Sequence, residues 1–139
     1  MGPDVILCGC FARDGLQHET VFVPTAEKVA LIEAFADAGF PRVEATSYSH
    51  PDRVPAFRDA SEVLARLTRK AGVWYKATCP NERAVLRAAA DFDAGHGANE
   101  VSLLVSATES HTLRNLRASR DEQWRRVEAM VAAAGDRFR

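Results

Sequence analysis

"DVILCGCFARDGLQHE" (residues 4–19) passes from an apolar run directly into Arg13 and Asp14, which are followed by a glycine and Gln17. The run at 4–10 is apolar on both of its alternating faces, which predicts a strand covered on both sides, as in a parallel sheet. The polar residues follow this strand too closely to form an ordinary surface loop. The stretch therefore predicts a strand that ends at a binding or catalytic site.

The rest of the chain alternates between short apolar runs and amphipathic helical stretches. "PTAEKVALIEAFADAGF" (24–40) predicts a helix with Thr25 as N-cap and Gly39 as the stop. Asn81 is the expected N-cap of a later helix, and Ser119 with Glu122 has the spacing of a capping box. Further strands are predicted at 42–47, 73–80 and 99–107, and further helices at 59–70, 82–95 and 120–135.

These segments make four βα units within one predicted domain, residues 1–139. Successive strands are separated by enough residues for right-handed helical crossovers in a parallel sheet. Two α/β architectures share this pattern, a small doubly wound sheet and the first half of a (β/α)8 barrel. Both place functional residues at the carboxyl ends of the strands.

Composition excludes several classes of protein. The 139 residues are 47% hydrophobic and 27% charged, with a formal net charge of -1, so neither nucleic acid nor a membrane surface is an expected partner. No apolar run is long enough to span a bilayer and no secretory leader is recognisable, which predicts a cytoplasmic protein.

Cys8, Cys10 and Cys79 fit no disulfide framework. Cys8 and Cys10 share a strand face, where small buried apolar residues are favoured over a soft metal site.

Glu44 is the most informative polar residue, because it stands between Val43 and Ala45 in an interior strand. A buried carboxylate needs a cation or a hydrogen-bond donor, and Arg13 is the expected partner. One interpretation is a structural ion pair at the rim of the sheet. The other is a chemical site, in which Asp14 offers oxygen to a hard divalent cation and Arg13 binds an oxyanion. Spacing alone does not separate them.

Four blocks of the chain resemble, in order, the 3-hydroxy-3-methylglutaryl-CoA lyase family. They are "RDGLQHE" (13–19), "VEATSYSHPDRVPAFRDASEV" (43–63), "CPNERA" (79–84) and "SATESHTLRNLRAS" (106–119). This family belongs to the metal-dependent lyases and Claisen-type synthases. The resemblance implies that the chain is the N-terminal (βα)4 half of a TIM (β/α)8 barrel. It also implies retro-Claisen cleavage of 3-hydroxy-3-methylglutaryl-CoA to acetoacetate and acetyl-CoA, with Mg²⁺ or Mn²⁺ as cofactor.

The resemblance also implies roles for five residues. Arg13 would be the cationic donor to the enolate, and Asp14 a catalytic metal ligand. Glu44 would orient Arg13, while Gln17 and Ser47 would lie on the substrate side. The family's other metal ligands, a His-x-His pair and an asparagine, are absent from this chain. The expected metal site is therefore incomplete here, and activity of this half alone is doubtful.

The chain also departs from the family's pattern. Phe11-Ala12 replaces the family's Gly-Pro, and the segment 110–119 is also similar to citramalate, isopropylmalate and homocitrate synthases. A Claisen-type synthase and a non-catalytic half-barrel remnant are the alternatives. The implied substrate is an acyl-CoA, as in leucine degradation and ketone-body metabolism. Unpaired outer strands and an expected apolar barrel face predict a homo-oligomer or pairing with the missing C-terminal half.

Overall fold

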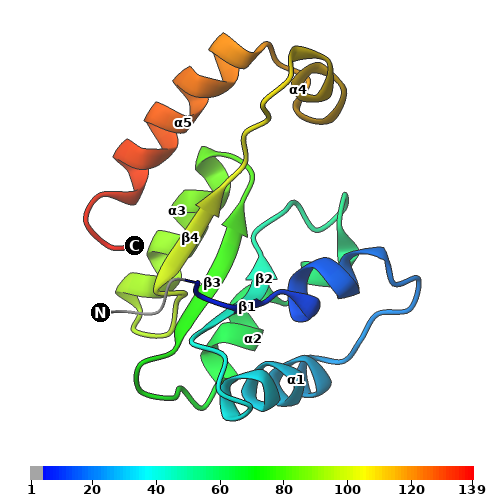
Figure 1. The fold of residues 1–139 in the computed structure, drawn as a ribbon, viewed down its shortest axis with the longest axis vertical. Coiled ribbons are helices and arrows are strands. Elements are labelled where there is room, and N and C mark those ends of the chain that lie inside the picture. The colour runs from blue at the N-terminus through cyan, green and yellow to red at the C-terminus, as the bar shows by residue number, and fades with distance from the viewer. Residues whose placement is uncertain (1–4) are drawn as a thin grey trace.

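A four-stranded parallel sheet forms the centre of the protein, as the sequence predicts (Figure 1). The computed structural model describes residues 5–139. Its strands are β1 (Cys8–Gly9), β2 (Arg42–Ser47), β3 (Trp74–Cys79) and β4 (Glu100–Leu103), and they lie in the order β1-β2-β3-β4. Sequential order with parallel pairing is the result of one helical crossover after another in the same direction.

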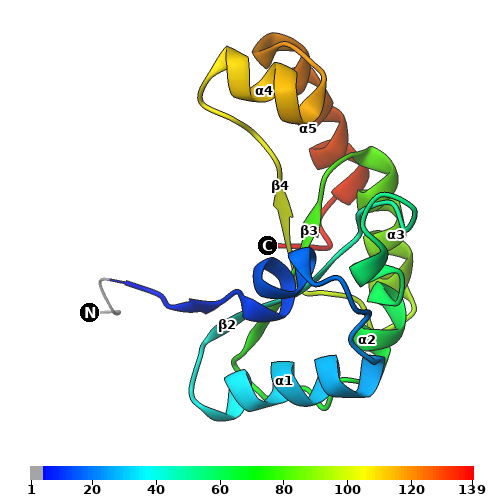
Figure 2. The same cartoon turned by 90° about the vertical axis from the view of Figure 1, so that its right-hand side faces the viewer.

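Helices connect the strands and cover one side of the sheet, as Figure 2 shows for α1, α2 and α3. The longer helices are α1 (Thr25–Asp37), α2 (Ala60–Arg66), α3 (Glu82–Asp93), α4 (Glu109–Leu116) and α5 (Arg120–Ala134). Shorter helical turns are η1 (Phe11–Gly15), η2 (Leu16–His18) and η3 (Pro55–Phe57). The order of elements confirms the four βα units.

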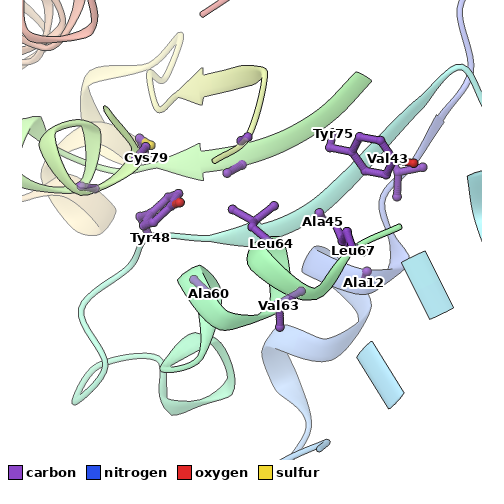
Figure 3. Close-up of a cluster of buried hydrophobic side chains, with 14 of the residues drawn as sticks. Ala12, Val43, Ala45, Tyr48, Ala60, Val63, Leu64, Leu67, Tyr75 and Cys79 are labelled. Carbon is purple, nitrogen blue, oxygen red and sulfur yellow. The ribbon is translucent and has the colours of Figure 1, made fainter. Parts of the chain in front are cut away.

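The hydrophobic core lies between the sheet and these helices (Figure 3). Alternate residues of the strands enter it, because side chains in a strand point to opposite faces in turn. The strands contribute Val43, Ala45, Tyr75, Ala77 and Cys79, each at most 3% exposed. The helices contribute residues such as Ile32, Leu64, Val85 and Met130, all fully buried.

Three predicted helix boundaries can be compared with the structure. Gly39 follows α1 with φ of +92°, a left-handed conformation that glycine adopts without strain, so the predicted stop is confirmed. Asn81 caps α3 by accepting a hydrogen bond from Ala84 N at 3.0 Å, also as predicted. The prediction for Thr25 is wrong. Pro24 precedes α1, and the Thr25 hydroxyl donates instead to Asp59 Oδ2 at 2.7 Å.

The segment after β4 contains a helix that the sequence did not reveal. α4 is short and polar, and Thr108 caps it by accepting from His111 N. Ser119 then caps α5 by accepting from Glu122 N at 3.1 Å, which confirms half of the capping box. The reciprocal half is wrong, because the Glu122 carboxylate bonds to Arg126 one turn further along α5.

The predicted double covering of the first strand is wrong in the described part of the chain. β1 is limited to Cys8–Gly9, and Val5, Ile6 and Leu7 before it are 72%, 48% and 64% exposed. Asp4 lies outside the described residues. These three residues precede the paired part of the strand, and β1 itself is an edge strand that pairs with β2 alone. No helix in the described region is long and apolar enough to cross a membrane.

The face of the sheet opposite the helices is polar, so the expectation of an apolar barrel face is wrong. Arg42 Nε donates to Glu100 Oε2 at 2.7 Å across the width of this face. Lys76 Nζ lies 3.4 Å from Glu44 Oε2 beside it. The residues that alternate with these in β2 and β3 enter the hydrophobic core, so the two faces divide polar from apolar side chains.

Candidate functional site

The Arg13-Asp14 pair lies on the helical turn η1, directly after β1. The Cys10 carbonyl accepts hydrogen bonds from Arg13 N at 3.1 Å and Asp14 N at 2.8 Å. Ala12 and Leu16, which are 1% and 6% exposed, anchor the turn in the protein interior. Phe11-Ala12 is therefore compatible with a tight turn that presents both polar side chains at the carboxyl edge of the sheet.

Three acceptors hold the Arg13 guanidinium. Its Nε donates to Glu44 Oε1 at 2.7 Å, and its Nη1 donates to Gln17 Oε1 at 3.2 Å and to Asp14 Oδ1 at 3.4 Å. Among residues 5–139, none accepts a hydrogen bond from Nη2. The predicted partnership of Arg13 with Glu44 is confirmed, and it leaves one amino group of the guanidinium available to an anionic ligand.

Glu44 is a buried, ionised carboxylate. It is 3% exposed and accepts hydrogen bonds from Arg13 and from the Thr78 hydroxyl. Burial by itself opposes ionisation. The bonds from Thr78 and Arg13, together with the charges of Arg13 and Lys76, nevertheless hold the pKa of Glu44 below its ordinary value. The negative charge fixes the arginine in place.

Asp14 has the environment of a solvent-facing ligand. Its side chain is 69% exposed, against 21% for that of Arg13. A carboxylate oxygen is a donor that Mg²⁺ and Mn²⁺ accept, so Asp14 fits the implied cofactor as one ligand. Within the described chain no group of three or more His, Cys, Asp or Glu side chains is arranged to hold a metal ion.

Ser47 lies on the same face of the sheet as Glu44, one step nearer the carboxyl end. The register pairs Glu44 with Lys76 and Ser47 with Thr78, with an irregularity between Glu44 and Thr46. This bulge brings both polar residues to one face, which regular alternation would not do for positions three apart. Ser47 is 2% exposed, and its hydroxyl bonds to Ser49 Oγ at 2.8 Å and to the Thr78 carbonyl at 3.2 Å.

Sequence reasoning placed Thr78 at the carboxyl end of the third strand without giving it a role, and it missed Lys76. Both lie on β3 and contact the Glu44 carboxylate, at 3.4 Å in the case of Lys76 Nζ. Their spacing could have indicated this position, because polar residues at positions i and i+2 of an otherwise apolar strand lie on the same face. Which residue of β2 they meet depends on the register.

A cavity of about 400 Å³ adjoins the turn that carries Arg13. It lies between the segment after Gln17 and the segment after β2. Its cationic side chains are Arg53 and Arg58, and the Arg58 guanidinium stacks on Phe22 at 3.7 Å from the ring centre. The other lining residues are His18, Glu19, Thr20, Val54, Pro55 and Ala56.

Replacing Glu44 by glutamine is expected to lower the free energy of unfolding by about 2 kcal/mol at neutral pH, since it removes a charged acceptor from a buried network. Because the pKa of Glu44 is lowered in the folded protein, its stabilisation is fully present above the ordinary value of 4.5 and is lost as the pH falls below 4.5 and through the lowered pKa. Urea unfolding should therefore show a shallower pH dependence below about 4.5 in the variant than in the wild type. Equal slopes would contradict an ionised Glu44.

Comparisons with known proteins agree with this geometry. The family model described as HMGL-like matches residues 4–138. The chain is 38% identical over 122 residues to the mitochondrial hydroxymethylglutaryl-CoA lyase of Rattus norvegicus, covering 88% of this chain and 36% of that protein. It is 37% identical over 110 residues to hydroxymethylglutaryl-CoA lyase YngG of Bacillus subtilis, covering 79% of this chain and 35% of the relative. The chain thus spans just over a third of these relatives.

Solved structures extend the likeness to the fold. An HMG-CoA lyase from Acinetobacter baumannii, in complex with coenzyme A and 3-methylmalate, matches with a TM-score of 0.86 and 32% identity over 100% of this chain and 45% of its own. The HMG-CoA lyase of Brucella melitensis matches with a TM-score of 0.84 and 38% identity over 94% of this chain and 44% of its own. The four βα units of this chain correspond to the N-terminal half of the TIM barrel in these HMG-CoA lyase structures. With a family model that matches almost its whole length, the chain belongs to the HMGL-like family.

Proposed function

We propose that this chain supplies the Arg13 side of the active site of a 3-hydroxy-3-methylglutaryl-CoA lyase. One observation carries the proposal. The buried Glu44 carboxylate binds the Arg13 guanidinium at 2.7 Å, while the side chain of the adjacent Asp14 is 69% exposed. A purely structural ion pair would need only the contact between Arg13 and Glu44. An exposed carboxylate next to a fixed guanidinium also suits binding of a metal ion and an anionic substrate.

Cleavage of a 3-hydroxy acyl thioester removes the proton from the tertiary hydroxyl and breaks the neighbouring carbon–carbon bond. The electron pair of that bond passes to the thioester, whose oxygen becomes negative as the enolate of acetyl-CoA forms. Arg13 would donate to this oxygen through Nη2, since Glu44 and Gln17 occupy Nε and Nη1. Because Glu44 and Gln17 fix the guanidinium before substrate arrives, little reorganisation is needed as the charge develops.

A divalent metal, Mg²⁺ or Mn²⁺, held in part by Asp14, would supply Lewis-acid polarisation of the substrate oxygens. Ser47 lies on the same sheet face as Glu44, but it is 2% exposed and its hydroxyl bonds to Ser49 and Thr78, so it would support the substrate side of β2 by holding this end of the strand. The cavity beside Gln17 has room for part of an acyl-CoA, and Arg53 and Arg58 give it cationic groups suited to phosphates. One HMG-CoA lyase among the similar structures is a complex with coenzyme A, which supports acyl-CoA as the substrate class.

The 139-residue chain alone is expected to bind Mn²⁺ only weakly, because Asp14 is one ligand and a tight hard-cation site needs about six oxygens. Titration followed by the electron paramagnetic resonance signal of free Mn²⁺ measures this, with Asp14→Asn as the variant that should abolish the weak binding. Tight one-to-one binding by the chain would contradict an incomplete site.

The proposal is tested with a chimera in which residues 4–138 replace the matching segment of the Bacillus subtilis enzyme. We expect the chimera to cleave 3-hydroxy-3-methylglutaryl-CoA to acetoacetate and acetyl-CoA in the presence of Mg²⁺ or Mn²⁺. The parent enzyme is the positive control, and circular dichroism with gel filtration establishes that the chimera is folded.

Two other outcomes would each replace the proposal. Product formed only from acetyl-CoA and a 2-oxo acid would make the protein a Claisen-type synthase. A folded chimera inactive in both assays would make it a non-catalytic half-barrel. The homo-oligomer and the place in leucine degradation or ketone-body metabolism stay predictions. The cytoplasmic location also stays a prediction, since the named relatives include mitochondrial and cytoplasmic proteins.

A further inference from the structure

Cys8, in β1, and Cys10, directly after β1, form a pair of thiols on the face of the sheet that carries the candidate site. Gly9 between them turns its backbone toward α1, where an added Cβ would lie 2.9 Å from Phe35 Cδ1. Because side chains alternate along a strand, Cys8 projects to the opposite face, and the contact between the two sulfur atoms places Cys10 on that face as well. Their sulfur atoms are 3.7 Å apart, and both residues are half-buried rather than fully buried as the sequence suggested.

The separation of the two residues allows a disulfide. Two residues separated by one position in a strand have Cα atoms about 6.6 Å apart, inside the range of roughly 4.4–6.8 Å that disulfides span. Closing the sulfur distance from 3.7 Å to the bonded value of about 2.05 Å requires rotation of the cysteine side chains. The intervening glycine has no Cβ and gives the backbone the freedom to accommodate a small ring.

We propose that Cys8 and Cys10 form a reversible disulfide, which makes this end of β1 a thiol–disulfide modification site. The oxidant is a small-molecule disulfide. One protein thiolate attacks it, which forms a mixed disulfide and releases one small thiol. The second protein thiolate then attacks the protein sulfur of that mixed disulfide and releases the other small thiol. In total the two protein thiols lose two electrons and two protons, which the oxidant gains.

The position of the pair connects it with the turn that carries Arg13 and Asp14. The Cys10 carbonyl is the acceptor for the backbone N–H groups of both residues, at 3.1 and 2.8 Å. A bond that restrains Cys10 therefore acts at the start of that turn. The proposal does not depend on the proposed lyase activity, because the bond is detected without substrate or metal.

Cys79 is a natural internal control. It is fully buried in the core, so a small-molecule disulfide cannot reach its sulfur, whereas Cys8 and Cys10 are half-buried. Burial, followed by the hydrogen bond and charge of Cys8 and by the charge of Glu44, raises the pKa of Cys10 to about 11. The exchange is therefore best run at mildly alkaline pH, where a larger share of Cys10 is thiolate.

The experiment incubates the folded 139-residue chain with oxidised glutathione, then counts thiols by alkylation after unfolding. We expect the count to fall from the three cysteines of the sequence to one. The tryptic peptide 1–13, which contains both residues, should lose the mass of two hydrogen atoms and regain it after reduction. Cys10→Ser should instead keep glutathione on Cys8, and Cys79→Ala should oxidise like the wild type.

Two results would overturn the proposal. One is a wild-type chain that stops at the mixed disulfide with glutathione, with no internal bond in peptide 1–13. The other is a disulfide that links two chains, visible as a dimer on non-reducing electrophoresis and absent at lower protein concentration. Either result would mean that the two sulfur atoms do not reach bonding distance within one chain.

Discussion

Replacing Arg13 by methionine is expected to lower kcat for cleavage of 3-hydroxy-3-methylglutaryl-CoA by about 10² to 10³ in the active chimera, the usual effect of removing one donor to a developing oxyanion. The methionine keeps the length and apolar stem of the side chain but cannot donate to the thioester oxygen. It also leaves Glu44, which is 3% exposed, without its guanidinium. The measurement is steady-state kinetics with the acetoacetate product detected directly.

Two comparison variants separate charge from geometry in this result. Arg13→Lys keeps the charge but loses the planar fork that bonds Glu44 and Gln17 at once, so it should recover only part of the rate. Arg66→Met removes an arginine that is 57% exposed and paired with Glu62, and it should leave kcat unchanged. If Arg13→Met retained the parent rate, the assignment of Arg13 as the enolate donor would be wrong.

Replacing Asp59 by asparagine is expected to lower the free energy of unfolding by about 3 kcal/mol, because it leaves a buried ammonium without its counter-charge. Lys28 Nζ lies 2.7 Å from Asp59 Oδ1, and the two side chains are only 4% and 7% exposed. Lys28 also donates to the Ala56 carbonyl at 2.5 Å and lies 4.1 Å from the centre of the Phe22 ring. These contacts join α1 to η3 beside the cavity. Urea unfolding measures the loss.

A surface pair of the same type provides the matched control. Asp37 pairs with Lys70 at 3.2 Å, but its side chain is 77% exposed, so Asp37→Asn should change the unfolding free energy by less than about 1 kcal/mol. The double variant Lys28→Met with Asp59→Leu removes both buried charges and should recover much of the stability. Equal losses for Asp59→Asn and Asp37→Asn would show that the buried pair is not the cause.

Lys28 shows what sequence reasoning missed and why. It lies four residues before Ile32 and eight before Ala36, on the one face of α1 that is buried. This spacing was a usable signal that the lysine enters the interior and needs an anion. Its partner could not be predicted, because Asp59 is 31 residues away in sequence and meets Lys28 only when α1 and α2 pack together.

The sequence by itself determined the four βα units, the helix end at Gly39, the cap at Asn81 and the pairing of Arg13 with Glu44. The first three depend on local patterning, which can be read from neighbouring residues. The fourth depends on a rule that holds in any fold, because a carboxylate within an apolar strand needs a cation or a donor once it is buried. Residue chemistry left Asp14 open between a structural ion pair and a metal ligand, and the family's motifs favoured the metal ligand. The motifs alone added the roles proposed for Gln17 and Ser47.

Only the tertiary structure decided which other groups surround that pair. The β2–β3 register places Lys76 beside Glu44, and a bulge in β2 brings Ser47 opposite Thr78 on the same face. The ion pair between Arg42 and Glu100 crosses from β2 to β4 and makes the open face of the sheet polar where the sequence suggested an apolar one. Register is set by long-range packing of whole strands, and a shift of one residue would reverse which side chains face the site.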